Sequence, residues 1–447
     1  MSEIPEPPKL VQTVIDRLPD GAPRRIVNGL SWLRVGASPP LTAHLLFTQP
    51  EERSPLMGAV TAAVASTDKG DGIGADWIGP TERGNKLDKL ADRSFVIPQY
   101  GALALKGEIP RIHFGLKVAR ETVMYGLRRW GAPRGKSQMS RPVNRQKTAD
   151  DMLTLVTAHS PFARHEDLLR WEASMSTALS LTGFFETVVD YAKKDEPEVP
   201  LDTARNSKAR EVSAGPLSKL AKLIDKKAPG ITPSGITRWS KRGVNLSAGL
   251  ALLNPDKPAL ATTLFTGFSL GDTVDGALAR EKGEDGADGM VEDVKADLEQ
   301  QIVTLAVLSV IAKRRGNKVA AVNYAIAAMA TPLSALTRAQ AEGQGYIVAE
   351  GGIGTRAGRG ILSGMGIAFN KRRDASDIIS AALASNTVNT VLERKDVVQK
   401  GIDSDHCKGV NDGPGFIEEA KIRERAIRPY AERGLAVGAA LLALAET

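Results

Sequence analysis

The sequence predicts an all-α fold built from two tandem helical-bundle halves, and three observations support this prediction. Apolar residues recur in stretches of helical length, of which Val319–Thr337 is the longest without a charge. Strand patterns, in which apolar and polar residues alternate, are few. A spaced set of aspartates near residue 272 has an imperfect copy near residue 68. A pattern repeated in this way indicates a tandem duplication.

Composition divides the chain into three parts. We expect a first half over residues 1–191, a charged linker over 192–229 and a second half over 230–447. The linker is rich in charge and proline and has little apolar periodicity. Within it, Ser218–Ala228 spaces apolar residues against lysines at helical intervals. That pattern suits a helix on an anionic lipid surface or a helix packed on its own domain.

The expected helices of the second half are apolar and lie between basic or glycine-rich turns. They span Ile302–Ala312, Val319–Thr337, Ile378–Leu392 and Leu435–Ala445. The glycine-rich stretch Glu350–Gly360 predicts a flexible loop, because it lacks the lysine and the strand-to-helix context of a phosphate-binding loop.

Four aspartates of the second half are spaced so that each pair shares one helix face. Asp272 and Asp275 are three residues apart, and Asp293 and Asp297 are four apart. Four converging carboxylates would repel one another and take up protons unless a cation joined them. The spacing therefore predicts a site for hard divalent cations, which prefer oxygen ligands.

Small residues and an arginine accompany these acids. Gly276 and Ala279 would let a bulky group approach the helix backbone, and Arg280 offers a fork of donors suited to phosphate. Metal and phosphate chemistry together is the functional interpretation. The alternative is a solvated acidic helix face, which is the usual meaning of a charge run.

The first half repeats the acidic pattern with two changes. Its carboxylates are Asp68, Asp71, Asp88 and Asp92. Asp76 stands where the second copy has Arg280, and a carboxylate there would repel a diphosphate. The connector between the two acid pairs is one residue shorter, which predicts that the second pair is set back along its helix. We therefore predict a degenerate site in the first half.

These residues resemble the signature of the CDP-alcohol phosphatidyltransferases. The second half fills every signature position: Asp272, Asp275, Gly276, Ala279, Arg280, Gly289, Asp293 and Asp297. The resemblance implies membrane helices and two divalent ions, Mg²⁺ or Mn²⁺, on the diphosphate of a CDP-linked lipid. It also implies that the four aspartates are metal ligands, that Asp297 is in addition the catalytic base, and that the small residues and Arg280 bind substrate.

Beyond its acids, the first half resembles the phosphatidylglycerophosphate synthases within that family. The resemblance runs through Leu87–Arg93, Ala119–Glu121, Leu127–Arg129 and Asn144–Thr148. In that subfamily, basic residues after the signature are associated with the phosphate of glycerol 3-phosphate. The resemblance thus implies that Arg120, Arg145 and Lys147 bind an acceptor phosphate, while a positive loop at a membrane boundary is an equal alternative.

The first helix of the family also has a counterpart in each half. Asn28, Ser31 and Arg34 resemble it at intervals of three residues, and Thr232–Thr237 resembles it ahead of the second copy.

Composition argues for a less apolar protein than the family would suggest. Hydrophobic residues make up 42% of the chain, and the mean hydropathy is −0.17. The net charge of +7 favours an anionic surface. A nucleic-acid motif and clustered aromatics are both missing from the sequence, so a lipid surface is preferred to nucleic acid. The single cysteine, Cys407, excludes an internal disulfide.

The sequence thus predicts a membrane enzyme of phospholipid biosynthesis with its active site on the cytoplasmic side. It would transfer a phosphatidyl group from CDP-diacylglycerol to an alcohol, with glycerol 3-phosphate preferred, and release CMP. The second half would be the catalyst, and both a homodimer and a pseudo-dimer of the two halves stay open. The alternative is a non-catalytic membrane-surface protein that retains the fold, which the low hydropathy and Asp76 favour.

Overall fold

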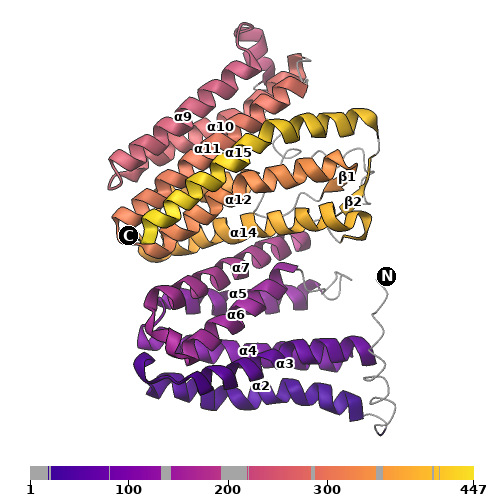
Figure 1. Ribbon diagram of the computed structural model, residues 1–447, viewed down its shortest axis with the longest axis vertical. Coiled ribbons are helices and arrows are strands. Elements are labelled where there is room, and N and C mark those ends of the chain that lie inside the picture. The colour runs from indigo at the N-terminus through magenta and orange to yellow at the C-terminus, as the bar shows by residue number, and fades with distance from the viewer. Residues whose placement is uncertain are drawn as a thin grey trace. The chain divides into compact units, whose positions relative to one another are not determined.

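The computed structural model of the 447-residue chain is almost entirely helical where it is described. It describes residues 19, 22–79, 81–131, 142–192, 219, 221–282, 287–348, 356–404, 407–411 and 413–446. The chain forms two compact units, Met1–Phe184 and Phe185–Thr447, here called unit 1 and unit 2 (Figure 1). The prediction of an all-α fold is confirmed.

Unit 1 is a bundle of long helices. They are α2 (Ala22–Phe47), α3 (Pro55–Ile78), α4 (Glu82–Lys106), α5 (Arg111–Gly131), α6 (Pro142–His159) and α7 (Glu166–Ala192), whose last turns belong to unit 2. The starts of α3 and α4 are fixed by side-chain caps, since Ser54 accepts a hydrogen bond from the Met57 amide and Thr81 from the Gly84 amide. Gly107 ends α4 in the left-handed conformation, at φ 76°.

The core of unit 1 lies where α2 packs on α3 and α4, and where α6 covers α3. Leu45, Phe95, Leu103 and Leu155 are fully enclosed there. Burial of such side chains contributes about 1.5–3 kcal/mol each. This core holds α2, α3 and α4 at fixed rotations, and those three helices carry the acidic residues of the first half and their partners.

Unit 2 contains a second helical bundle with a small hairpin. Its elements are α9 (Pro233–Leu253), α10 (Pro258–Lys282), α11 (Ala287–Arg314), α12 (Lys318–Gly343), β1 (Tyr346–Val348), α13 (Arg356–Ala368), α14 (Arg373–Lys400), β2 (Cys407–Val410) and α15 (Pro414–Glu446). The four apolar helices expected from the sequence are confirmed as parts of α11, α12, α14 and α15.

Helix α12 is the centre of unit 2, with α14 and α15 packed along it (Figure 1). The contact with α15 is close because Gly434 and Gly438 have no side chains. A Cβ at Gly438 would lie 1.9 Å from the Met329 side chain. Among the described residues, α12 is also the one helix long and apolar enough to cross a membrane, and 67% of that stretch is buried within the protein.

Three local features differ from the sequence-based expectations or refine them. The antiparallel pair β1 and β2 was not predicted, because its strands are short and lie far apart in sequence. Residues 356–360, expected in a loop, begin α13, and 349–355 lie outside the described residues. Residues 221–227 of the linker are helical, and Ala221 packs against Ala277 and Leu278. This contact supports a helix packed on its own domain.

Candidate active site

Four aspartates of unit 1 converge from two helices. Asp68 and Asp71 lie on one face of α3, and Asp88 and Asp92 lie on one face of α4. The shorter connector does not set the second pair out of reach, which corrects that sequence-based expectation. The physical reason is local: the Thr81 cap starts α4 almost directly after α3 ends, so the short turn absorbs the missing residue.

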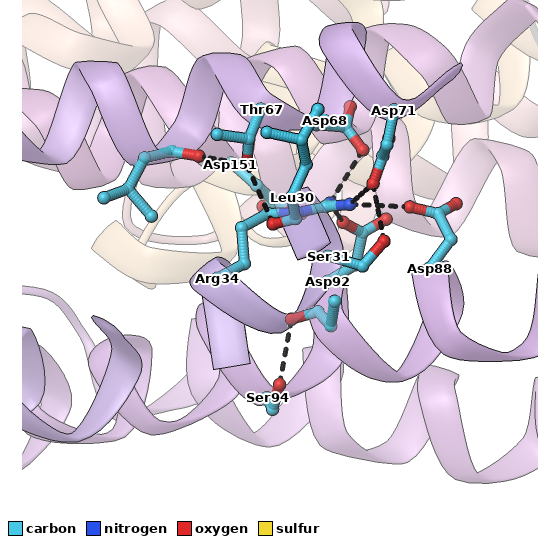
Figure 2. A network of polar contacts seen from close by, with 12 residues as sticks. Leu30, Ser31, Arg34, Thr67, Asp68, Asp71, Asp88, Asp92, Ser94 and Asp151 are labelled. Atoms are coloured by element: carbon cyan, nitrogen blue, oxygen red, sulfur yellow. Dashed lines mark hydrogen bonds and ion pairs between the residues drawn. The ribbon is translucent and has the colours of Figure 1, made fainter. Parts of the chain in front are cut away.

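A single arginine from α2 joins all four carboxylates. The Arg34 side chain is fully buried, and its Nη1 donates to Asp68 at 2.9 Å and to Asp92. Its Nη2 donates to Asp88 at 2.7 Å and to Asp71. Figure 2 shows the guanidinium at the centre of the acids.

A hydroxyl from the same helix completes the cluster. Ser31 lies one turn before Arg34 on α2, and its Oγ donates to Asp71 at 2.7 Å. From the sequence, both α2 residues resemble the family's first helix, but they were not predicted to lie in the site. Their spacing of three residues was the available signal.

The electrostatics of the cluster are unfavourable despite Arg34. Burial raises the pKa of Asp68 and of Asp71, and Arg34 offsets part of this effect. Burial raises the pKa of Asp92 well above its usual range, and the charges of Asp68 and Asp88 add to the shift. One guanidinium facing four carboxylates leaves an excess of negative charge, so the cluster can accept more positive charge.

The donor set fits a divalent cation. Asp68, Asp88 and Asp92 each offer an oxygen, and these oxygens lie within 4.8 Å of one another. Carboxylate oxygens are the ligands that Mg²⁺ and related hard cations prefer. The acids of unit 1 therefore have the chemistry and the spacing of a cation site.

A pocket of about 170 Å³ opens beside the acids. Asp88 and Asp92 form one wall, and Lys117, Arg120 and Lys147 lie along the pocket lining as well. Two of the three acceptor-phosphate candidates from the sequence, Arg120 and Lys147, thus line the pocket. The side chain of the third, Arg145, lies outside the described residues.

Glu121 ties the cations of this pocket together. It accepts a hydrogen bond from Arg93 Nε at 2.9 Å, forms an ion pair with Arg120 and lies 3.5 Å from Lys147 Nζ. Burial alone would raise the pKa of Glu121, but the three cations lower it to about 2. Glu121 is therefore ionised and holds the basic side chains in place.

A buried ion pair also lines the pocket. Lys117 is paired with Asp151, which also accepts a hydrogen bond from Ser176 and lies 3.2 Å from Lys147 Nζ. Burial lowers the pKa of Lys117 to about 8, while the lysines bring the pKa of Asp151 down to about 2 against the effect of burial. Lys117, Glu121 and Asp151 were not predicted as site residues from the sequence.

In unit 2 the corresponding acids are described in part. Asp275 on α10 is buried and accepts a hydrogen bond from Thr237 on α9. Asp297 on α11 accepts one from Gln301 at 2.8 Å, and Gln301 accepts one from Arg359 at 2.8 Å. Ala279 is half-buried on α10.

The remaining predicted site residues of unit 2 have side chains outside the described set. These are Asp272, Gly276, Arg280, Gly289 and Asp293. The side chain of Asp76 in unit 1 also lies outside the described set. The structure accordingly brings together all four predicted acids of the first half and leaves the convergence of the second set a prediction.

Comparison with known proteins adds one match. A family model described as CDP-alcohol phosphatidyltransferase matches residues 25–179, which run from α2 into α7 and include the four acids of unit 1. No curated protein matches the chain.

Proposed function

We propose that the chain transfers a phosphatidyl group from CDP-diacylglycerol to glycerol 3-phosphate and releases CMP, because residues 25–179 match the CDP-alcohol phosphatidyltransferase family. The family as a whole transfers such a group from a CDP-alcohol to an acceptor. The donor lipid and the acceptor are the finer points of the proposal. One observation supports them best: the acidic cluster of unit 1 lies beside a pocket lined with basic side chains.

The acids would serve the donor. Divalent cations, held by Asp68, Asp71, Asp88 and Asp92, would neutralise the diphosphate and stabilise the leaving CMP. The chain's own part is to hold these carboxylates in a fixed arrangement, through the hydroxyl of Ser31 and the packing of α3 against α2. Such preorganisation supplies much of the rate enhancement in phosphoryl transfer.

The pocket would serve the acceptor. Arg120 and Lys147 would bind the phosphate of glycerol 3-phosphate, while Glu121 and Asp151 keep these cations oriented. Asp92 lies both in the acidic cluster and on the pocket wall, so its carboxylate could take the proton of the acceptor hydroxyl.

Unit 2 is the second candidate for the same reaction. It holds the complete signature, including Arg280, and the sequence analysis assigned catalysis to it with Asp297 as base. The support for unit 1 is that its four acids converge beside a pocket lined with basic side chains. A non-catalytic role at a membrane surface is the competing class of function, supported by the low mean hydropathy of −0.17.

A CMP-release assay tests the proposal. The full chain is supplied with CDP-diacylglycerol in mixed micelles, Mn²⁺, and either glycerol 3-phosphate or glycerol, two acceptors that differ by the phosphate alone. We expect CMP release with glycerol 3-phosphate and far less with glycerol. Lys147→Gln should raise the KM for glycerol 3-phosphate more than it lowers kcat, because it removes a phosphate contact.

Other outcomes separate the alternatives. Equal rates of CMP release with both acceptors would contradict the binding of the acceptor phosphate in the pocket. The proposed transferase activity would still stand. A lack of CMP release with any alcohol, from protein that binds vesicles, would favour the non-catalytic role. Since the family is membrane-integral, extraction by carbonate rather than detergent would also count against lipid access.

A further inference from the structure

One hydrogen bond occurs in the same form within unit 1 and within unit 2, and it identifies equivalent positions on α2 and α9. In unit 1, Ser31 on α2 donates to the second acid of the motif, Asp71. In unit 2, Thr237 on α9 donates to the second acid of its own motif, Asp275. The same contact in both units makes Ser31 and Thr237 equivalent positions.

One turn further along, the two helices differ. Three residues after Ser31 comes Arg34, which enters the acidic cluster. Three residues after Thr237 comes Ser240, whose hydroxyl donates to the backbone oxygen of Phe268. The equivalent position of unit 2 therefore supplies a neutral hydroxyl to the backbone where unit 1 supplies a cation to the acids.

Arg34 lies at the point where a shared cation would bind. Its side chain has no exposed surface, and it contacts Asp68, Asp88 and Asp92, the three carboxylates whose oxygens converge. Its Nε has no hydrogen-bond partner in the part of the chain that the structure describes. The hydrogen bonds of the Arg34 guanidinium in this part of the chain all go to the four acids.

We propose that Arg34 is a built-in counter-cation of unit 1, which neutralises the acids in the metal-free protein and competes with divalent cations for the same carboxylates. A divalent ion carries twice the charge of a guanidinium and coordinates at shorter range, so it can displace Arg34 from the acids. The released guanidinium is then available to an anionic group next to the ion. The proposal rests on the proposed function only in that the ion is the one used by that reaction.

A direct test measures Mn²⁺ binding, without catalysis, in Arg34→Gln. Asp275→Asn and Asp297→Asn are introduced into both test and reference proteins, so that unit 1 dominates the signal. Free Mn²⁺ is followed by electron paramagnetic resonance. Removing the competing charge should tighten Mn²⁺ binding by about tenfold or more, which corresponds to about 1.4 kcal/mol. Arg34→Lys, which keeps the charge, should stay near the reference affinity.

Arg53→Gln is the matched control. Arg53 is another fully buried arginine of unit 1, also without a partner for Nε among described atoms, but it pairs with Glu108 and the Ala158 carbonyl. Its substitution should destabilise unit 1 and leave Mn²⁺ affinity unchanged. An equal gain in affinity in Arg53→Gln would show that loosening of the bundle, rather than competition, is responsible.

Folding of the variant is itself informative. If Arg34→Gln folds only with excess Mn²⁺ and unfolds on chelation, the ion has replaced the guanidinium as predicted. If it is unfolded with and without Mn²⁺, or folds and binds Mn²⁺ no more tightly than the reference, Arg34 is a permanent structural partner and the proposal is wrong. CMP release plays no part in this readout, so a failed transferase assay would leave the result standing.

Discussion

The two units hold the second aspartate of the motif in the same way, but the helix that holds it differs one turn further along. Both α2 and α9 use a hydroxyl to hold the second aspartate of the motif. At the next turn α2 adds Arg34 to the acids, whereas the equivalent position of α9 is Ser240, which donates to a backbone oxygen. The comparison teaches that the signature aspartates alone do not determine a site, because the charge that faces them comes from a different helix.

The last aspartate of each motif also has different surroundings. Asp92 lies on a pocket wall together with Val96, which is four residues further along α4. Asp297 accepts a hydrogen bond from Gln301, the residue four positions further along α11, and Gln301 is in turn held by Arg359. The last acid of unit 1 is paired with Arg34 and lines a pocket, whereas the last acid of unit 2 accepts a hydrogen bond from a residue of its own helix.

The largest expected effect concerns the buried pair that supports the pocket of unit 1. Lys117→Met leaves the buried Asp151 without its main counter-charge, and we expect a loss of about 3–5 kcal/mol in unfolding free energy. Lys241→Met is the counterpart in unit 2, where the pair with Glu299 is partly exposed, and should cost less than about 1 kcal/mol. Chemical denaturation followed by unit-resolved hydrogen exchange measures both. Similar costs would mean that the pocket is not supported by this pair.

The next effect decides which unit catalyses. If unit 1 is the site, Asp92→Asn should lower kcat for CMP release by about a hundredfold or more, within the usual range for loss of a general base. Asp297→Asn makes the same change in unit 2 and is therefore the matched control. It should have a small effect on kcat. If the complete signature of unit 2 marks the catalyst, Asp297→Asn should instead cause the larger loss of kcat. A large loss in Asp297→Asn with an active Asp92→Asn would move the catalytic site to unit 2.

A smaller effect tests the equivalence of the two first helices. Ser31→Ala and Thr237→Val each remove a hydroxyl from a buried aspartate and should each cost about 1–2 kcal/mol in metal-free protein. Unit-resolved hydrogen exchange should place each loss in its own unit. If one variant is neutral, its hydroxyl does not anchor the aspartate and the alignment of Arg34 with Ser240 is lost.

Much of the helical framework could be predicted from the sequence, because apolar periodicity and capping residues are local signals. The spacing of Asp68 with Asp71 and of Asp88 with Asp92 also placed each pair on one face. Arg34 could not be assigned in the same way. Its partners lie 34 to 58 residues away, so its contact with them depends on how α2 packs against α3 and α4, which no local pattern encodes.

The pocket residues were predicted in part for the same reason. Arg120 and Lys147 followed from the resemblance to a known subfamily, whereas Glu121 and Asp151 acquire their role only by lying next to those cations in the folded bundle. The pairing of β1 with β2 joins residues some 60 positions apart and had no local signal. Sequence reasoning thus found which chemical groups are present, and tertiary packing decided which of them meet.

The smallest expected effect is a difference in acid sensitivity between the units. Burial lowers the pKa of His113 and of His159 in unit 1 to about 3, with nearby cationic groups adding to both shifts, so these two histidines are neutral in the folded chain. Because the unfolded value is near 6.5, the unfolded state binds more protons as the pH falls. Stability from these groups is therefore complete above pH 6.5 and is lost progressively toward pH 3. Between pH 7 and 6 the two together should cost unit 1 about 1 kcal/mol.

Unit 2 has no histidine among its described residues, so it provides the internal reference for this loss. The double variant His113→Gln, His159→Gln should reduce the pH dependence of unit 1 and leave that of unit 2 as it was, as measured by unit-resolved hydrogen exchange at pH 7 and pH 6. The difference between variant and wild type is the decisive quantity, since the raised pKa values of Asp68, Asp71 and Asp92 act in the opposite direction in both proteins. An unchanged slope in the double variant would mean that these histidines bind protons in the folded chain, and that burial does not keep them neutral.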